Sequence, residues 1–236
     1  ILGTSLTLLA ALITGCNSND DDNAALTQVP STTQVTITPS LGKILNAKVV
    51  LKNAKTGVVL GSGITSTKPG ADEGTAKFDA IRTTDPVIVE VQGTAGATYF
   101  DESTKNSAPF GAGQVIKAVV PTLTSNANIG VSALTDIAYK AALKKAGDNE
   151  KSITAAIATA SNDAIRTALA PELSSITIAP ALVGSADDLT KLTNTPEGKY
   201  ALRLAALAQL VPNTDTTPAL TALQKLAEDF ADGTFD

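Results

Sequence analysis

The chain lacks the side chains on which the commonest enzyme sites depend. Its 236 residues include no His, no Trp and no Met, and they include a single Cys, Cys16. Without His, a Ser-His-Asp triad, a Cys-His pair and a His-ligated metal are excluded. With one Cys, intrachain disulfides, Cys-based zinc sites and redox pairs are excluded as well. We therefore expect no catalytic residue, no metal site and no cofactor.

Aromatic residues and positive charge are also scarce. There are three Tyr and five Phe, and 18 basic residues stand against 23 acidic ones, for a formal charge of −5. Platforms for sugars and grooves for single-stranded nucleic acids depend on exposed aromatic faces. Nucleic-acid binding also uses a surplus of basic residues. Composition thus argues against a nucleic-acid partner.

The first fifteen residues, 1–15, are uncharged and contain the apolar run Leu6–Ile13. This run has about the length of a signal-peptide core, and it is too short to span a bilayer, which takes about 20 apolar residues. The sequence Ile13-Thr14-Gly15-Cys16 then resembles the lipobox of bacterial lipoproteins. That resemblance implies signal cleavage after Gly15 and a diacylglycerol anchor on the thiol of Cys16. The alternative is a buried element with Cys16 as a core thiol.

The residues that follow favour the lipoprotein interpretation. Asn17–Asn23 is a polar, charged run that is typical of a solvated tether, and we assign residues 16–32 to a lipidated flexible tether. In the sorting rule of enteric lipoproteins, Asn17 in place of Asp favours the outer membrane. We expect attachment to the bacterial cell envelope through the lipid on Cys16. The lack of an initiator Met and of a basic leader segment predicts a native start before Ile1.

Residues 33–121 have the pattern of a β-sandwich. Short runs rich in β-branched residues recur at roughly ten-residue spacing, separated by Gly, Pro and Asn. Gly57 supplies the positive φ that closes a hairpin turn after Asn53. The predicted strands are Gln34–Thr38, Ala47–Asn53, Val58–Ile64, Thr75–Ile81, Val87–Gln92, Thr98–Asp101 and Gln114–Val120.

Two motifs of this region carry a family resemblance. The order of strand, Asn53-Ala54-Lys55-Thr56-Gly57, strand, Gly-rich loop and Gly74-Thr75-Ala76-Lys77-Phe78 resembles the Ig-like or prealbumin-like modules of bacterial surface proteins. The carboxypeptidase regulatory-like and Cna-B-like groups are the nearest. The resemblance implies a spacer, stalk or adhesion unit. Some Cna-B-like modules carry a Lys–Asn isopeptide bond; Lys48 lies on an early strand, but no Asn on a closing strand matches it.

Residues 122–236 change to a helical period after a crossing loop at Thr122–Asn128. Capping residues, Pro at first turns and terminal Gly residues mark a four-helix domain. Residues 172–194 are predicted to be irregular, and a native continuation beyond Asp236 is expected. The fold class is therefore α+β and multidomain. The predicted helices run from Ser132 to Gly147, from Asn149 to Pro171, from Thr195 to about Leu210, and from Thr217 to Gly233.

Five groups of residues could form sites, and each has a simpler interpretation. Asp20–Asp22 could hold a divalent cation, but a tri-Asp run suits a tether. Asp232–Asp236 lacks the spacing of an EF-hand loop and suits a helix end. Asp187-Asp188 suits a helix N-terminus or surface charge, and Tyr99-Phe100 suits core and edge packing. Ser62 lies between two glycines without the pattern of a nucleophile elbow, which suits a turn.

These observations favour a non-catalytic lipoprotein that displays a structural or adhesive module to a protein or surface polymer. The first alternative is an extracellular fibre that self-assembles by strand exchange through residues 33–38, with Val35 and Ile37 as the inserted side chains. A less favoured alternative is a metal- or carboxylate-dependent hydrolase.

Overall fold

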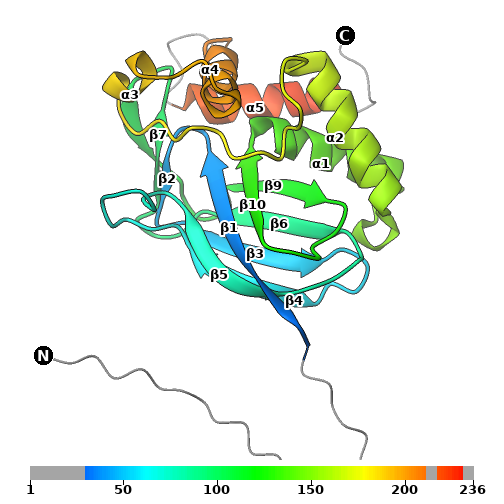
Figure 1. The fold of residues 1–236 in the computed structure, drawn as a ribbon. Coiled ribbons are helices and arrows are strands. Elements are labelled where there is room, and N and C mark those ends of the chain that lie inside the picture. The colour runs from blue at the N-terminus through cyan, green and yellow to red at the C-terminus, as the bar shows by residue number, and fades with distance from the viewer. Residues whose placement is uncertain (1–29, 211–216, 231–236) are drawn as a thin grey trace, which may run out of the picture.

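The computed structural model describes residues 30–210 and 217–230. This part of the chain contains ten strands, five α-helices and one 3-10 helix, with the strands before most of the helices (Figure 1). The strands form three sheets. The α+β class predicted from the sequence is confirmed, and along the chain the strands precede the helices as predicted.

The largest sheet has four antiparallel strands in the order β4-β3-β6-β9. Its inward face consists of Val, Leu, Ile and Ala side chains at alternate positions, because successive side chains of a strand point to opposite faces of the sheet. All four strands match predicted runs. They are β3 (Lys48–Asn53), β4 (Val59–Ile64), β6 (Val87–Gln92) and β9 (Val115–Val120).

A second sheet faces it, with β1 (Thr32–Ser40) between β5 (Ala76–Ile81) and β10 (Ala127–Ser132). β1 pairs antiparallel with β5 and parallel with β10. The crossing loop predicted at Thr122–Asn128 is wrong at its end, because Ala127 and Asn128 already pair with β1. The smallest sheet consists of short strands, and its order is β2 (Ile44–Leu45), β7 (Thr98–Asp101) and β8 (Asn106–Pro109).

Glycines let β4 approach β5 closely. A Cβ on Gly61 would lie 2.8 Å from the backbone oxygen of Asp79, and a Cβ on Gly63 would lie 2.7 Å from the Phe78 ring. The aromatic ring therefore occupies the space that two side chains would fill. The turn predicted around Ser62 is wrong, because this residue lies inside β4.

Six helical elements follow β10. Thr154 and Thr195 cap α2 and α4 with their hydroxyls, and Pro stands at the first turn of α4 and of α5. The second predicted helix starts later than Asn149, because Asn149 caps a separate 3-10 turn. The predicted irregular stretch also contains one short helix. The elements are α1 (Ala133–Lys145), η1 (Glu150–Ser152), α2 (Ala155–Leu169), α3 (Ala186–Thr190), α4 (Pro196–Ala208) and α5 (Pro218–Asp229).

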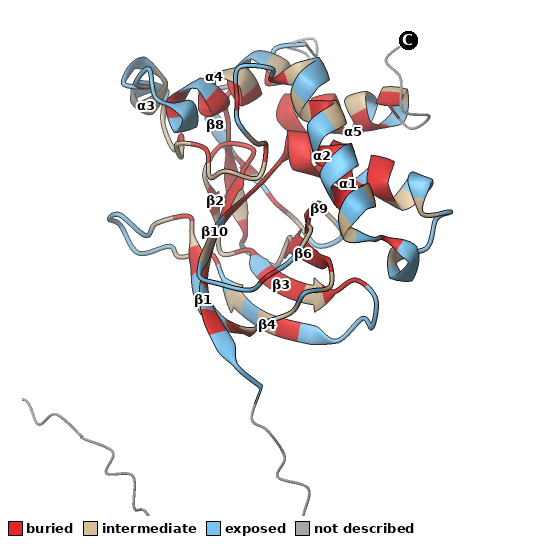
Figure 2. Cartoon of the chain, turned by 45° about the vertical axis from the view of Figure 1, so that its right-hand side comes forward, coloured by how far each residue is buried: buried red, intermediate tan, exposed pale blue. Residues whose placement is uncertain are grey.

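One hydrophobic core runs from the strands into the helices. Val35 of β1, Ile116 of β9, Leu134 of α1, Tyr200 of α4 and Leu223 of α5 belong to the same buried cluster. Figure 2 shows buried residues continuing from the sheets into α1 and α5. The helices lie near the C-terminal end of β1, where α1 and α2 also pack against β9, and β1 begins at the opposite end (Figures 1 and 2).

Candidate functional site

The predicted lipidation site lies outside the described residues. Gly15 and Cys16 precede residue 30, as does the acidic run Asp20–Asp22. Asp232–Asp236 follows the last described residue, Phe230. Cleavage and lipid attachment therefore stay predictions from the sequence.

The predicted strand-exchange residues are described, and they lie in the chain's own core. Val35 and Ile37 are fully buried. In the second sheet, Val35 stands opposite Phe78 of β5 and Ala127 of β10, while Ile37 stands opposite Ala76 and Ile129. β1 thus has a hydrogen-bonded neighbour along each edge within this chain.

Two of the simpler interpretations are confirmed. Tyr99 and Phe100 are both buried, and the Tyr99 ring meets the Phe110 ring edge-on, with centroids 6.4 Å apart. Asp188 lies in the first turn of α3, where its Oδ2 accepts a hydrogen bond from the Gly184 N–H at 2.9 Å. Burial works to raise the pKa of Asp188, but hydrogen bonds from Gly184 and Ser185 lower it below its usual value.

A charge cluster lies on the face of the four-stranded sheet that is turned away from the second sheet, beside α1 and η1. We define it as Lys52, Glu90, Lys117, Tyr139 and Glu150. The two Oε atoms of Glu90 lie 2.7 Å from Lys52 Nζ and 3.0 Å from Lys117 Nζ. Lys117 Nζ also lies 3.2 Å from Glu150 Oε1 and 4.7 Å from the centre of the Tyr139 ring. Tyr139 donates its hydroxyl hydrogen to Glu150.

At neutral pH the carboxylates of the charge cluster are ionised, whereas Lys117 and Tyr139 keep their protons. Burial works to raise the pKa of Glu90, but hydrogen bonds and charges from Lys52 and Lys117 lower it below its usual value. Burial likewise works to lower the pKa of Lys117, but Glu90 and Tyr139 raise it well above its usual value. Burial and the Glu150 hydrogen bond raise the pKa of Tyr139 to about 12. These groups suit an ion-pair network that fixes η1 and α1 to the sheet better than acid–base chemistry near pH 7.

Sequence reasoning did not single out the charge cluster, although a signal was present. Glu90 is the single charge in the apolar run Val87–Val91, and Lys117 is the single charge in Val115–Val120. The pairing of β6 with β9 places these two residues directly opposite each other. One acid and one base in two otherwise apolar strands therefore indicate a cross-strand ion pair.

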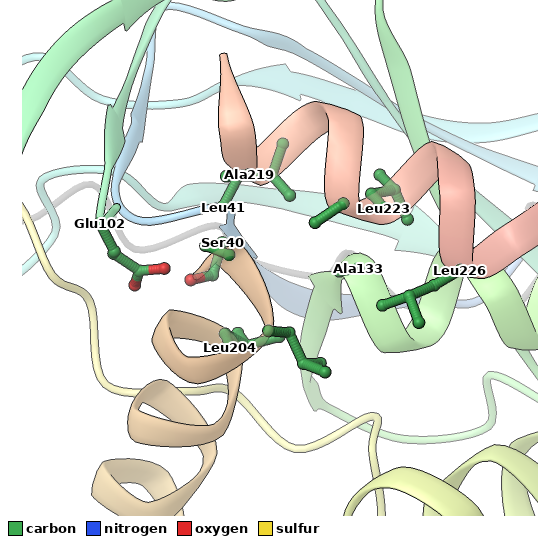
Figure 3. Close-up of a pocket in the computed structure, with 11 residues that line it drawn as sticks. Ser40, Leu41, Glu102, Ala133, Leu204, Ala219, Leu223 and Leu226 are labelled. Carbon is green, nitrogen blue, oxygen red and sulfur yellow. The ribbon is translucent and has the colours of Figure 1, made fainter. Parts of the chain in front are cut away.

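A second group of polar atoms lies at a cavity between β1, α4 and α5. Figure 3 shows Glu102 and Ser40 at one side of this cavity, with apolar side chains around the rest. Glu102 is 2 % exposed and Ser40 is fully buried. Glu102 Oε1 and Ser40 Oγ have no hydrogen-bond partner among the described residues. The remaining lining is Leu41, Leu204, Leu207, Leu223 and Leu226 with Ala133, Ala208, Ala219 and Ala222.

Glu102 differs chemically from the carboxylates of the charge cluster. Burial, with a smaller contribution from the charge of Asp101, raises the pKa of Glu102 to about 8. No Lys or Arg is among the residues that line the cavity. A carboxyl in such surroundings keeps its proton at neutral pH, because ionisation would place an uncompensated charge in an apolar space. Strongly shifted acids of this kind mark candidate functional positions.

The described residues contain neither a cluster of metal ligands nor a membrane-spanning helix. Within residues 30–210 and 217–230, no three Asp, Glu or Cys side chains come together so that they could hold a metal ion. No helix in these ranges combines the length and the apolar character needed to cross a membrane. Comparison with known proteins finds no matching protein family, no matching curated protein and no matching solved structure.

Proposed function

We propose that this chain is a non-catalytic lipoprotein of the bacterial cell envelope, displayed on a lipid anchor at Cys16. The observation that carries the proposal is the apolar run ending in Ile13-Thr14-Gly15-Cys16, followed by the polar residues Asn17–Asn23. Its β-rich part would serve as a structural or adhesive module of the Ig-like or prealbumin-like kind. One acyl chain gives only marginal membrane binding, so the anchor needs the two or three chains that lipoproteins carry.

The position of β1 supports this proposal. β1 begins at the end of the molecule opposite the helices (Figure 1), and Arg82 at this end donates a hydrogen bond from Nε to the Thr32 backbone oxygen at 2.9 Å. A chain arriving from Cys16 therefore meets the fold at this end. Because Ser31 and Thr32 are hydrogen-bonded to Arg82, a flexible tether would span residues 17–30, with a root-mean-square reach of about 20 Å. The helical end would then face away from the membrane and toward a partner.

Metabolic labelling with a palmitate analogue tests the anchor. We expect the wild-type chain to carry the label and to fractionate with membranes, and we expect Cys16→Ala to do neither. Ser18→Ala is the matched control, because it changes a neighbouring small residue and leaves the thiol. Equal labelling of wild type and Cys16→Ala, or no labelling of either, would contradict the proposal.

The orientation can be tested separately in vesicles. With Cys16 acylated, a single added cysteine can carry a fluorophore, either at Thr84 beside the start of the sandwich or at Lys199 on α4. Both residues are exposed. We expect stronger energy transfer from position 84 than from position 199 to an acceptor on lipid headgroups. Equal transfer, or stronger transfer from position 199, would contradict the proposed orientation of the helices. It would not contradict the proposed lipid anchor.

A further inference from the structure

We propose that Glu102 and the cavity it faces form a proton-controlled latch for α5. With the Glu102 carboxyl protonated, α5 docks against α4 and the end of β1. With the carboxyl ionised, the docked arrangement is weakened and α5 opens more often. This inference is independent of the proposed lipid anchor.

The geometry of the cavity supports the latch. Glu102 follows β7 directly and lines the same cavity as Ala219 and Leu223 of α5 and Leu204 of α4 (Figure 3). The cavity has a volume of about 10 Å³, which is the room that one water molecule needs. A single water there can offer hydrogen bonds to Glu102 Oε1 and Ser40 Oγ, the two unpartnered polar side-chain atoms among the residues that line the cavity. Hydration of an ion takes many more waters than this space admits.

The electrostatic surroundings of Glu102 oppose ionisation of its carboxyl group. Asp101, on the same strand end, is the charged group that acts on Glu102. The lining residues supplied by β1, α1, α4 and α5 carry no ionisable side chain in the described chain. A buried charge without a partner costs far more than a neutral carboxyl in the same place. Opening α5 relieves this cost because it exposes Glu102 to water.

The direction of the pH effect follows from linkage. In the docked state burial raises the pKa of Glu102 to about 8, whereas a solvated glutamate has its ordinary value of 4.5. Between these values the docked state holds a proton that the open state has lost. The equilibrium constant for opening therefore rises about tenfold per pH unit from about pH 5 to about pH 8. Above pH 8 it levels off, because both states are then ionised.

Hydrogen exchange on the full chain tests the latch. The measured quantity is the protection factor of the α5 backbone amides at Ala222 and Leu223, corrected for the intrinsic exchange rate at each pH. In the wild type we expect protection to fall about tenfold per pH unit between pH 5 and pH 8. In Glu102→Gln, which stays neutral, we expect no such slope. Glu228→Gln is the control, because Glu228 is an exposed acid on the same helix.

A second measurement uses the wild type alone, so that it does not depend on whether Glu102→Gln folds. Carbon NMR of the glutamate side-chain carboxyls should give one resonance, assigned to Glu102, with a midpoint near pH 8. A Glu102 midpoint near 4.5 would overturn the proposal. So would an equal pH slope in folded Glu102→Gln and wild type, because the titrating group would then lie elsewhere.

Discussion

The side chain of Asp101 accepts a hydrogen bond from the backbone N–H of Ala219 at 3.1 Å, across 118 positions of sequence. Ala219 lies in the first turn of α5, where helical N–H groups have no partner within the helix. The same carboxylate accepts bonds from the Ser103 N–H at 3.0 Å and the Tyr99 hydroxyl at 3.1 Å. Asp101 thus serves as a cap for a helix that is distant in sequence.

Asp101→Ala should destabilise the fold by about 1–3 kcal/mol, the range for losing a cap or leaving buried partners unsatisfied. The α5 amides should lose more hydrogen-exchange protection than those of α2, because the lost bond holds α5. Asp79→Ala is the matched control, since Asp79 is exposed on β5. A loss spread evenly over both helices would argue against a local capping role.

Removing one member of the Glu90–Lys117 pair should destabilise the fold more than removing both members. The Glu90 side chain is 6 % exposed and the Lys117 side chain is 23 % exposed. Removing one partner should therefore lower the free energy of unfolding by more than the roughly 1 kcal/mol of an exposed pair. The loss should reach at most the roughly 3–5 kcal/mol of a buried pair. We expect Glu90→Val or Lys117→Val alone to lower the unfolding free energy within that range. The double variant should recover part of the loss, because no unpaired charge remains between β6 and β9.

Urea unfolding of the two single variants and the double variant gives the coupling energy as a double-mutant cycle. The exposed pair Lys77–Asp72, with side chains 48 % and 60 % exposed, is the control cycle and should give a coupling close to zero. A double variant as unstable as the sum of both single variants would show that Glu90 and Lys117 act independently.

Ile37→Ala should destabilise the chain by about 2–5 kcal/mol, because it removes a fully buried side chain from the centre of the core. Gln34→Ala, at an exposed position of the same strand, should leave stability nearly unchanged. Size-exclusion chromatography and negative-stain microscopy of the wild type separate the alternatives for β1. A strictly monomeric species would argue against a fibre built by strand exchange, whereas concentration-dependent filaments would favour it.

The strands that the sequence predicts correctly are those with a local signal. Runs such as Val87–Gln92 and Gln114–Val120 are rich in β-branched residues, and this signal needs no knowledge of the partner strand. β2, β8 and β10 contain at most two such residues each. β10 reads Ala-Asn-Ile-Gly-Val-Ser, and it forms because β1 offers a free edge. Gly130 within it accommodates a close neighbour, since a Cβ there would lie 2.2 Å from the Ile178 backbone oxygen.

The helices and the candidate sites also divide into those with a local sequence signal and those without one. Thr195-Pro196 marks the start of α4 through chemistry within one turn, and the prediction there is confirmed. The start of α2 was predicted too early, because Asn149 and Thr154 are both capping residues and only the fold shows which of them begins the long helix. Glu102 carries no sequence signal at all. Its surroundings come from β1, α1, α4 and α5, so only the assembled fold makes it unusual.

The central position of β1 has a mechanical consequence. A pull transmitted through the chain before Thr32 acts along the strand and loads its hydrogen bonds to β5 and β10 together. Bonds loaded in parallel share the force, whereas bonds at the end of an edge hairpin open one after another. Under tension between an anchor and a partner, the fold should therefore resist extension at its N-terminal end until several bonds rupture at once.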